Sequence, residues 1–398
     1  MDTICIVGGC GHVGLPLGIA FTLAGAKVTL LDIDEQRLEA VRSGHMPFLE
    51  QGAEEALPAA LKTGRLQVSN ELRHVAEHDN VIVTIGTPVD EFLDPSIRSF
   101  DRSLDAVLKH MRDGQLLILR STVFPGVSDR LARRAHASKR RIDVAHCPER
   151  IAQGFALDEL GRLPQIIGGT TPRATARAAR LFDLLGVRLL TLPALEAELA
   201  KLFANSYRYI SFAIANQFYL IAEKFGCDFY RIHEAITLDY PRMANFPKAG
   251  FAGGPCLLKD TMQLGAFNHN HFILGQAAMM INEGLPQALV DQVKRQYDLS
   301  AMKAAILGMA FKGNNDDPRA SLSYKLRKVL LLECQDVICT DPYIQEPDFV
   351  SLEEALNQGD IFFLGACHEE YRHLRISKPL VDIFHFMPAA QASSRLAA

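Results

Sequence analysis

The sequence predicts an α/β protein with an N-terminal Rossmann domain, a central helical region built around one long helix, and a C-terminal Rossmann-like domain. Three observations predict this class: short apolar runs alternate with helical patterns before residue 193, one long helical pattern covers 194–225, and apolar runs return after residue 299. Alternating strands and helices are typical of parallel sheets covered on both faces. A chain of 398 residues exceeds what one core usually serves, so several domains are expected.

Composition and charge exclude several classes of protein. Hydrophobic residues make up 48% of the chain and charged residues 22%, as in folded globular proteins. A formal net charge of −4 predicts no nucleic-acid partner and no anionic membrane surface. No apolar run reaches the roughly 20 residues of a membrane helix, and no basic and apolar leader precedes the first apolar run. We therefore expect a cytoplasmic protein.

The cysteines support the same compartment. The chain has eight, at positions 5, 10, 147, 227, 256, 334, 339 and 367, and no CxxC pair or clustered histidine spacing accompanies them. This scatter is typical of reduced thiols and not of a disulfide framework or a zinc site. The sequence predicts no metal.

The first 32 residues predict a dinucleotide site. An apolar run at 4–7 is followed by Gly9-Cys-Gly-His-Val-Gly14, a helical pattern to Gly25, and a second apolar run that stops at Asp32. The glycines let a pyrophosphate approach the helix N-terminus, and the acid can hold the ribose hydroxyls. An acid with no arginine directly after it favours NAD over NADP, although Arg37 follows one turn later. The predicted contacts to NAD are Gly9, Gly11, His12, Val13, Gly14, Asp32 and Arg37.

Three further apolar runs, at 80–85, 116–119 and 142–145, each end in a polar turn. Ligands collect at the carboxyl ends of strands in doubly wound sheets, so these turns form a predicted polar rim. A single threonine or glutamate there is more often a cap or turn residue, but together they favour a site. The rim residues assigned to the cofactor are Thr87, Pro88, Ser121 and Thr122, and the third turn carries Glu149 and Arg150.

The pattern at 194–225 predicts one helix that is long and apolar enough to bridge two lobes and to offer a surface for self-association. Glu198, Lys201 and Asn205 are spaced i, i+3 and i+7, which places them on one face of this helix. Charged stripes are usually solvated, but apolar residues flank this one, and we interpret it as functional. Further helical patterns follow within 228–245 and over 261–297.

The stretch Gly250–Asp260 places Cys256 in a glycine-rich loop at a predicted helix start. Glycines allow close approach of a ligand, and free amides at a helix start favour a thiolate. Lys259 adds positive charge, and Asp260 is expected on the same side of the helix, where it can orient a water or exchange a proton. The alternative is that Cys256 is a small buried hydrophobe.

Apolar runs at 304–307, 338–340 and 361–364 predict a second α/β lobe. Its first loop carries Lys312 and Arg319 without a GxGxxG pattern, which suits phosphate recognition. The predicted domains are 1–193 for cofactor binding, 194–298 for the helical region and 299–387 for the second lobe. A flexible tail is predicted over 388–398.

Six motifs occur in one order along nearly the entire chain: GCGHVGLP, STVFPG, CPERIAQG, ExAKLFAN, GFAGGPCLLKD and FKGNNDDPRAS. This set resembles the nucleotide-sugar 6-dehydrogenases, the group that includes UDP-glucose and GDP-mannose dehydrogenases. The resemblance implies an NAD-dependent enzyme that oxidises the C6 alcohol of a UDP-sugar to a carboxylate in two hydride transfers. It also implies a helical middle that forms a homodimer or a higher homo-oligomer, and a C-terminal domain that binds the nucleotide.

The resemblance implies roles for individual residues. Cys256 would form a thiohemiacetal and then a thioester, Lys201 and Asn205 would stabilise the oxyanion, and Asp260 with Thr122 would position water. Glu149 would assist hydrolysis, and Arg319 would lie near the cofactor or the phosphates. Arg242 would reach the substrate of a neighbouring subunit. The implied substrate contacts are Glu149, Arg150, Lys201, Asn205, Arg242, Phe251, Gly253 and Lys312.

Two motifs point to different sugars. The Cys-Leu-x-Lys-Asp pattern resembles UDP-glucose and GDP-mannose enzymes, whereas Pro-Glu-Arg at 148–150 resembles enzymes of UDP-N-acetylhexosamines, which have a histidine where Pro255 stands. We expect UDP-linked rather than GDP-linked sugars. Two other functions remain open: a one-step NAD-dependent alcohol dehydrogenase of the β-hydroxyacid type, which has no use for Cys256, and a non-catalytic nucleotide-binding protein.

Overall fold

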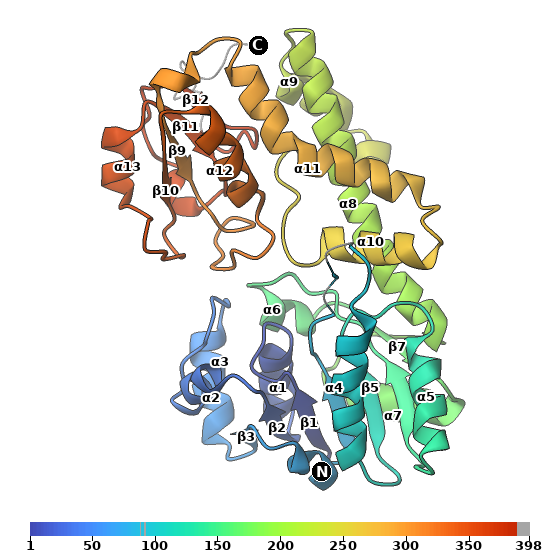
Figure 1. Ribbon diagram of the computed structural model, residues 1–398. Coiled ribbons are helices and arrows are strands. Elements are labelled where there is room, and N and C mark those ends of the chain that lie inside the picture. Colours follow the sequence, from blue (N-terminus) through green and yellow to red (C-terminus); the bar gives the residue numbers. More distant parts are fainter. Residues whose placement is uncertain (88, 91–92, 388–398) are drawn as a thin grey trace. The chain divides into compact units, whose positions relative to one another are not determined.

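The computed structural model describes residues 1–87, 89–90 and 93–387. Pro88, a predicted cofactor contact, and the predicted tail at 388–398 lie outside the described residues. The chain forms two compact units, Met1–Ala204 and Asn205–Ala398, here called the N-terminal and C-terminal units. Helix α8 (Ala194–Lys224) contributes residues to both units (Figure 1). The finer domain limits stay a prediction.

The N-terminal unit is built on one eight-stranded sheet. Its strand order is β3 (Leu66–Ser69), β2 (Lys27–Leu31), β1 (Thr3–Val7), β4 (Asn80–Val83), β5 (Leu116–Leu119), β6 (Asp143–His146), β7 (Gln165–Gly169) and β8 (Leu189–Pro193). All neighbours pair in parallel except β6 and β7. The first six strands have the order 3-2-1-4-5-6 of dinucleotide-binding folds, which confirms the predicted Rossmann domain.

Helices cover both faces of this sheet (Figure 1). They are α1 (Gly14–Leu23), α2 (Glu35–Arg42), α3 (Ala53–Lys62), α4 (Ile97–His110), α5 (Val127–Ala137), α6 (Ala156–Leu160) and α7 (Pro172–Asp183), with a 3₁₀ turn at Leu72–Glu77. Alternate residues of one strand enter different cores: Ile4 and Ile6 of β1 lie in the core with α1, and Cys5 in the core with α4. Burial on both faces explains why β1, β4 and β5 each carry a continuous apolar run.

The C-terminal unit combines helices with a smaller sheet. After α8 come α9 (Phe229–Thr237), a 3₁₀ turn at Pro241–Met243, α10 (Leu257–Phe267) and α11 (Ile273–Val293). The sheet order is β10 (Asp336–Thr340), β9 (Lys303–Leu307), β11 (Ile361–Leu364) and β12 (Leu380–Val381), all parallel. Helices α12 (Leu322–Glu333) and α13 (Leu352–Gln358) complete it, with 3₁₀ turns at Leu299–Ala301 and Glu369–Tyr371.

The prediction of one continuous helical stretch over 261–297 is wrong. Helix α10 already begins at Leu257, and the chain leaves the helix between Phe267 and Ile273. His269 and Asn270 have φ of 52° and 59°, in the left-handed region that a helix cannot contain. Asparagine tolerates this conformation better than most residues, so His269-Asn270 marks the break.

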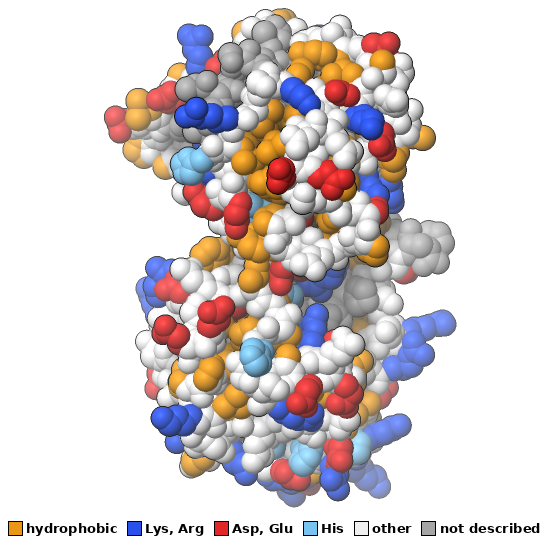
Figure 2. All heavy atoms as spheres, turned by 90° about the vertical axis from the view of Figure 1, so that its left-hand side faces the viewer, with side chains coloured by type: hydrophobic (Ala, Val, Ile, Leu, Met, Phe, Trp, Pro, Cys, Tyr) orange, Lys and Arg blue, Asp and Glu red, His pale blue; other side chains and the backbone are white. Residues whose placement is uncertain are grey.

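Positive and negative side chains are interspersed on the face shown in Figure 2. Within the described part of the chain, no helix has the combination of length and apolar character that crossing a bilayer requires.

Candidate active site

The glycine turn after β1 has one open position between two crowded ones. A Cβ on Gly9 would lie 2.7 Å from the Leu30 Cβ, and a Cβ on Gly14 would lie 2.5 Å from the Gly8 carbonyl oxygen. On Gly11 the nearest atom would be 3.5 Å away. Gly9 and Gly14 therefore pack the turn against β2 and against itself, whereas Gly11 leaves its backbone approachable, as pyrophosphate binding requires.

Backbone amides hold Asp32 at the end of β2. Its Oδ2 accepts a hydrogen bond from the Cys10 amide at 2.9 Å, and its Oδ1 accepts from the Ile33 amide at 2.8 Å. The predicted ribose acid is thus attached to the glycine turn. Arg37 pairs with Asp34 at 3.3 Å, and Asp34 is the N-cap of α2. Arg37 was the residue that kept NADP possible as the cofactor. In the structure its guanidinium is already paired with a carboxylate.

The remaining predicted residues of the turn lie at the start of α1. Val13 is the N-cap residue of this helix. The imidazole of His12 lies 4.0 Å from the Phe48 ring, measured between centroids, and 3.1 Å from the Gln153 side-chain amide. Gln153 belongs to the CPERIAQG motif, so the fold brings the first and third motifs together.

Hydroxyl groups connect the ends of β1, β4 and β5. Thr84 Oγ1 lies 2.9 Å from the carbonyl oxygens of both Val7 and Gly8, an anchor that sequence reasoning missed. Thr87 donates to the Thr122 carbonyl at 2.6 Å, and Ser121 donates to the Ile85 carbonyl at 2.6 Å. The structure therefore brings Thr87, Ser121 and Thr122 together, and their contacts to a cofactor stay a prediction.

Glu149 is held by a buried arginine. The Arg120 side chain is 1% exposed, and its guanidinium pairs with Glu149 Oε2 and donates to the Gln165 side chain at 2.7 Å. Glu149 Oε1 accepts from the amides of Arg150 and Ile151 at 2.6 and 2.8 Å. Both carboxylate oxygens are thus engaged, which fixes the side chain in place. Sequence reasoning assigned no role to Arg120; the only clue was its position before Ser121.

Arg150 and Lys201 lie near the same strand ends. The guanidinium of Arg150 donates to the Pro164 carbonyl. Lys201 is largely buried, and its charge acts on His146, the last residue of β6. Burial first, then the positive charges of Arg120 and Lys201, lower the pKa of His146 to about 3. The imidazole is therefore neutral at neutral pH.

Glu198 caps helix α5 instead of lining a solvated stripe. Its carboxylate accepts from the amides of Gly126 at 2.6 Å and Ser128 at 2.8 Å. The side chain is buried, and burial raises its pKa although the hydrogen bonds from Ser128 and Gly126 oppose the shift. Glu198 thereby attaches the STVFPG loop to α8.

We expect Glu198→Gln to remove a pH dependence of stability. Because the folded-state pKa is raised, the unfolded state loses its proton first, and the unfolding free energy falls as pH rises from about 4.5 through the folded-state pKa. Above that pKa the loss is complete. Urea unfolding of both proteins between pH 4 and 8 measures the difference, and parallel pH curves would contradict this assignment.

Cys256 is the N-cap residue of α10 and is exposed. The predicted helix start is confirmed, and the alternative of a buried hydrophobe is wrong. Glycines shape the loop: a Cβ on Gly254, whose φ is +100°, would lie 2.6 Å from the Phe311 ring, and one on Gly253 would lie 2.9 Å from the Ala320 carbonyl. The Gly254 amide donates to that carbonyl at 2.9 Å. The loop before Cys256 is thus fitted to residues 311–320.

A buried carboxylate lies one turn after Cys256. Asp260 is fully buried, and its two oxygens accept from Asn205 Nδ2 at 2.5 Å and from Lys259 Nζ at 2.6 Å. Asn205 belongs to α8, so this bond joins α8 to α10. The structure therefore joins three predicted residues into one hydrogen-bonded cluster beside the cysteine loop.

Two buried asparagines that sequence reasoning missed anchor the start of this loop. Asn216 of α8 donates to the Gly250 carbonyl at 3.0 Å and accepts from the Gly250 amide at 2.8 Å. It also donates to Asn282 of α11 at 2.9 Å. Phe251 packs edge-on against Phe384, with centroids 5.7 Å apart. The sequence signal for the two asparagines was that each is a polar residue inside the apolar pattern of its helix.

Three predicted basic residues have different surroundings. Arg319 forms a two-pronged ion pair with Asp317, at 2.6 and 2.8 Å, and this pairing raises its pKa; the Cys256 sulfur contributes in the same direction. Lys312 lies 5.8 Å from the centroid of the Phe311 ring. Arg242 is exposed and lies 4.5 Å from the Tyr240 ring centroid. Arg319 is therefore within electrostatic reach of Cys256, whereas Arg242 stacks on its own loop.

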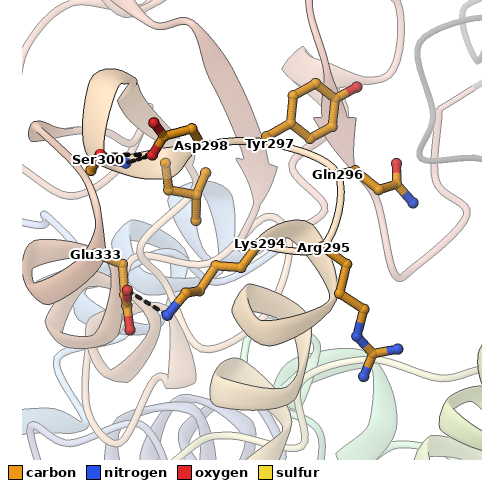
Figure 3. Close-up of a pocket in the computed structure, with 8 residues that line it drawn as sticks. Lys294, Arg295, Gln296, Tyr297, Asp298, Ser300 and Glu333 are labelled. Carbon is orange, nitrogen blue, oxygen red and sulfur yellow. Dashed lines mark hydrogen bonds and ion pairs between the residues drawn. The ribbon is translucent and has the colours of Figure 1, made fainter.

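A pocket of about 480 Å³ lies after α11 (Figure 3). Lys294 and Glu333 pair across it at 2.7 Å, and Asp298 accepts from Ser300 at 2.6 Å. None of the predicted site residues that the structure describes lines it. We assign this pocket no role.

The fold and the site define a class of protein, the NAD-dependent oxidoreductases. The N-terminal unit has the strand order of dinucleotide-binding folds, with Gly11 approachable and Asp32 held by backbone amides. The same chain has the exposed Cys256 one turn before the buried Asp260. More narrowly, the chain belongs to the UDP-glucose/GDP-mannose dehydrogenase family. The NAD binding, central and UDP binding domains of that family match residues 2–185, 195–284 and 305–387.

Individual relatives cover nearly the whole chain. A UDP-N-acetyl-D-mannosamine dehydrogenase of Methanocaldococcus jannaschii is 30% identical over 381 residues, 93% of this chain and 86% of the relative. A UDP-glucose dehydrogenase structure from Pyrobaculum islandicum has a TM-score of 0.89 at 27% identity, covering 100% of this chain and 96% of that one. A UDP-D-ManNAc dehydrogenase structure from Pyrococcus horikoshii has a TM-score of 0.88 at 28% identity, covering 99% and 93%.

Proposed function

We propose that this protein is an NAD-dependent UDP-sugar 6-dehydrogenase that oxidises the C6 alcohol to a carboxylate in two hydride transfers. The observation that carries the proposal is the exposed Cys256 at the start of α10, followed one turn later by the buried Asp260–Asn205 pair. The match of residues 305–387 to a UDP binding domain supports the substrate class. Relatives named as dehydrogenases of two UDP-sugars support the reaction.

The glycine turn and Asp32 fit the cofactor, because Gly11 leaves room for a pyrophosphate and Asp32 offers acceptors for ribose hydroxyls. When bound, NAD⁺ accepts the hydride in each oxidation. Thr87, Ser121 and Thr122 continue this binding surface at the ends of β4 and β5. Arg319 is proposed to contact the cofactor or the phosphates.

Cys256 is the proposed nucleophile. After the first oxidation its thiolate adds to the C6 aldehyde, which forms a C–S bond and an alkoxide that takes up a proton as the thiohemiacetal. The thiohemiacetal hydroxyl then loses its proton while C6 gives up the second hydride to a second NAD⁺, and the product is a thioester. Water then attacks the acyl carbon, and the C–S bond breaks to release the carboxylate and the thiolate. One product consumes two NAD⁺ and one water.

The surrounding residues stabilise charge and position water. Lys201 and Asn205 donate to the developing oxyanion, and removal of one such donor typically slows a reaction by about 10²- to 10³-fold. Asp260 is held by Asn205 and Lys259 and, with Thr122, positions the water. Glu149 assists hydrolysis from the fixed position that Arg120 gives it. The proposed substrate contacts further include Arg150, Phe251, Gly253 and Lys312, with Arg242 supplied by a neighbouring subunit.

Stoichiometry tests the reaction. We expect two NADH for each uronic acid formed, because the alcohol loses four electrons. UDP-glucose, UDP-GlcNAc, UDP-ManNAc and GDP-mannose are compared by absorbance at 340 nm, and the acid is quantified by mass spectrometry. One NADH per product would instead identify a one-step alcohol dehydrogenase. Absence of turnover with every sugar would favour the non-catalytic alternative, and turnover of GDP-mannose alone would contradict the UDP preference.

We also propose a homodimer formed through α8. Tyr207, Ile214 and Ile221 are seven residues apart on one side of this helix, and they are 68%, 42% and 45% exposed. Such an apolar stripe on a long helix favours self-association. Sedimentation equilibrium is expected to give a dimer, and Ile214→Glu with Ile221→Glu is expected to shift it to monomer. A wild-type monomer would refute the proposal.

A further inference from the structure

The C-terminal unit contains an acid that corresponds to Asp32 of the N-terminal unit. Asp341 directly follows β10, as Asp32 directly follows β2, and it accepts from the Met309 and Ala310 amides at 2.6 and 3.0 Å. Asp32 remains partly exposed, whereas the Asp341 side chain is 0% exposed and contacts the fully buried His368. An enclosed carboxylate cannot receive ribose hydroxyls, so this second acid has a different task.

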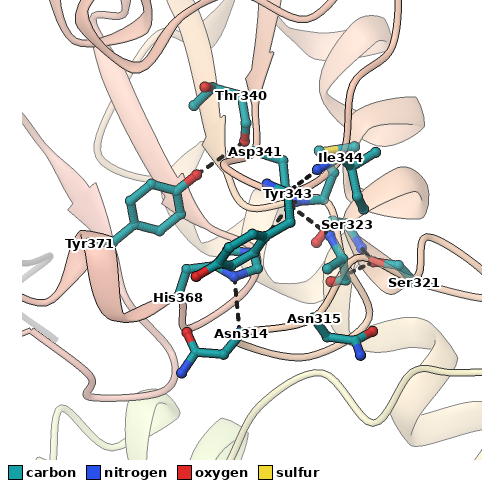
Figure 4. A network of polar contacts seen from close by, with 12 residues as sticks. Asn314, Asn315, Ser321, Ser323, Thr340, Asp341, Tyr343, Ile344, His368 and Tyr371 are labelled. Atoms are coloured by element: carbon teal, nitrogen blue, oxygen red, sulfur yellow. Dashed lines mark hydrogen bonds and ion pairs between the residues drawn. The ribbon is translucent and has the colours of Figure 1, made fainter. Parts of the chain in front are cut away.

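His368 connects Asp341 to the neighbouring loop (Figure 4). Its Nδ1 accepts a hydrogen bond from the Asn314 amide at 3.0 Å. The imidazole proton therefore lies on Nε2, which donates to Asp341 Oδ2 at 3.1 Å. Burial would raise the pKa of Asp341, but the hydrogen bonds from His368 and the backbone outweigh it and lower the pKa. Nε2 of His368 thus holds the Asp341 carboxylate, and Nδ1 holds the Asn314 backbone amide.

The loop held in this way, residues 308–321, is called the Lys312 loop. It lies tightly on the chain around His368: a Cβ on Gly313 would come within 2.1 Å of the Cys367 carbonyl oxygen, and Asn314 Oδ1 accepts from the Glu369 amide at 2.8 Å. The same loop supplies Phe311 and Ala320, which shape the glycines before Cys256. It therefore connects the His368 turn with the cysteine loop.

We propose that His368 is a positioning residue for the nucleotide: by anchoring Asn314 through Nδ1, it places Lys312 and Arg319 for the anionic diphosphate of the substrate. This proposal rests on the proposed function. Asp341 serves as the support that fixes the imidazole ring and its tautomer. Because the anchor is a single bond to one backbone amide, its contribution can be separated from that of the Asp341 bond.

Two substitutions separate the two bonds. In His368→Asn the side-chain oxygen replaces Nδ1 and keeps the bond to Asn314, and in His368→Gln the side-chain amide replaces Nε2 and keeps the bond to Asp341. Isothermal titration with UDP and with NAD⁺ compares both variants with wild type. We expect His368→Gln to weaken UDP binding about tenfold and His368→Asn to change it less than about twofold. NAD⁺ binding is expected to change less than UDP binding in both variants, because all its proposed contacts except Arg319 belong to the N-terminal unit.

Hydrogen exchange of the Lys312 loop gives a readout without a ligand. Faster exchange in His368→Gln than in His368→Asn supports the anchor. The reverse order, equal UDP affinity in both variants, or parallel loss of UDP and NAD⁺ binding would overturn it. Tyr343→Phe is the matched control, since it removes the hydroxyl bond to Glu370 beside His368 and leaves Asn314 untouched.

A second variant keeps the proposal testable if His368→Gln fails to fold. Gly313→Ala displaces the loop from the Cys367 carbonyl without changing the histidine, and the same selective loss of UDP binding is expected; unchanged UDP binding would overturn the proposal. Failure of the proposed function is a separate result, because wild type would then oxidise no UDP-sugar. UDP titration and hydrogen exchange of the Lys312 loop would still test the role of His368.

Discussion

Cys256→Ala is expected to reduce uronic acid formation by more than about a thousandfold, because in the proposed mechanism the thiol keeps the half-oxidised sugar attached between the two hydride transfers. Cys256 is exposed at the N-cap of α10, in a loop that two glycines fit to residues 311–320. Replacement of an exposed side chain leaves the fold intact. The measurement is product formation with each UDP-sugar at saturating NAD⁺.

Cys227→Ala is the matched control, since Cys227 is also exposed but lies between α8 and α9. Its activity is expected to equal that of wild type. Incubation of wild type with UDP-sugar and limiting NAD⁺ is expected to leave a sugar adduct on the peptide of Cys256, detected by mass spectrometry. Undiminished uronic acid production by Cys256→Ala would refute the assignment of the nucleophile.

Arg120→Leu is expected to destabilise the protein by about 3–5 kcal/mol, because it leaves the nearly buried Glu149 carboxylate without its charge partner. The guanidinium also donates to the Cys147 carbonyl at 3.1 Å and lies 5.1 Å from the Phe182 ring centroid, and these contacts are lost as well. Chemical unfolding measures the change in unfolding free energy.

Two comparisons show whether the pairing is the cause. The double variant Arg120→Leu with Glu149→Leu is expected to regain part of the stability, since no unpaired charge remains. Arg141→Leu is the surface control: its side chain is 85% exposed and pairs with Asp113 at 3.2 Å, so little change is expected. A double variant as unstable as the single one would show that packing of Arg120, and not its charge, stabilises the unit.

Local patterns predicted much of the fold. Strands β1, β4, β5, β9 and β11 are buried along most or all of their length, and their apolar residues stand out as continuous runs. Strand β8 was missed because most of its residues are exposed or half exposed, and edge strand β3 for a similar reason. The break between α10 and α11 was missed because helical patterns lie on both sides of it. Residues 268–272, which form the break, include no proline or glycine.

The sequence by itself determined the cofactor turn, the long helix and the position of Cys256, since each depends on residues within a short stretch of chain. Tertiary structure alone decided the partners of the charged and polar groups. Arg120 meets Glu149, Asn216 meets Gly250, and His368 meets Asp341 across 29, 34 and 27 residues. Such pairs form only when the packing of strands and helices excludes water, which is a property of the folded chain and not of any local pattern.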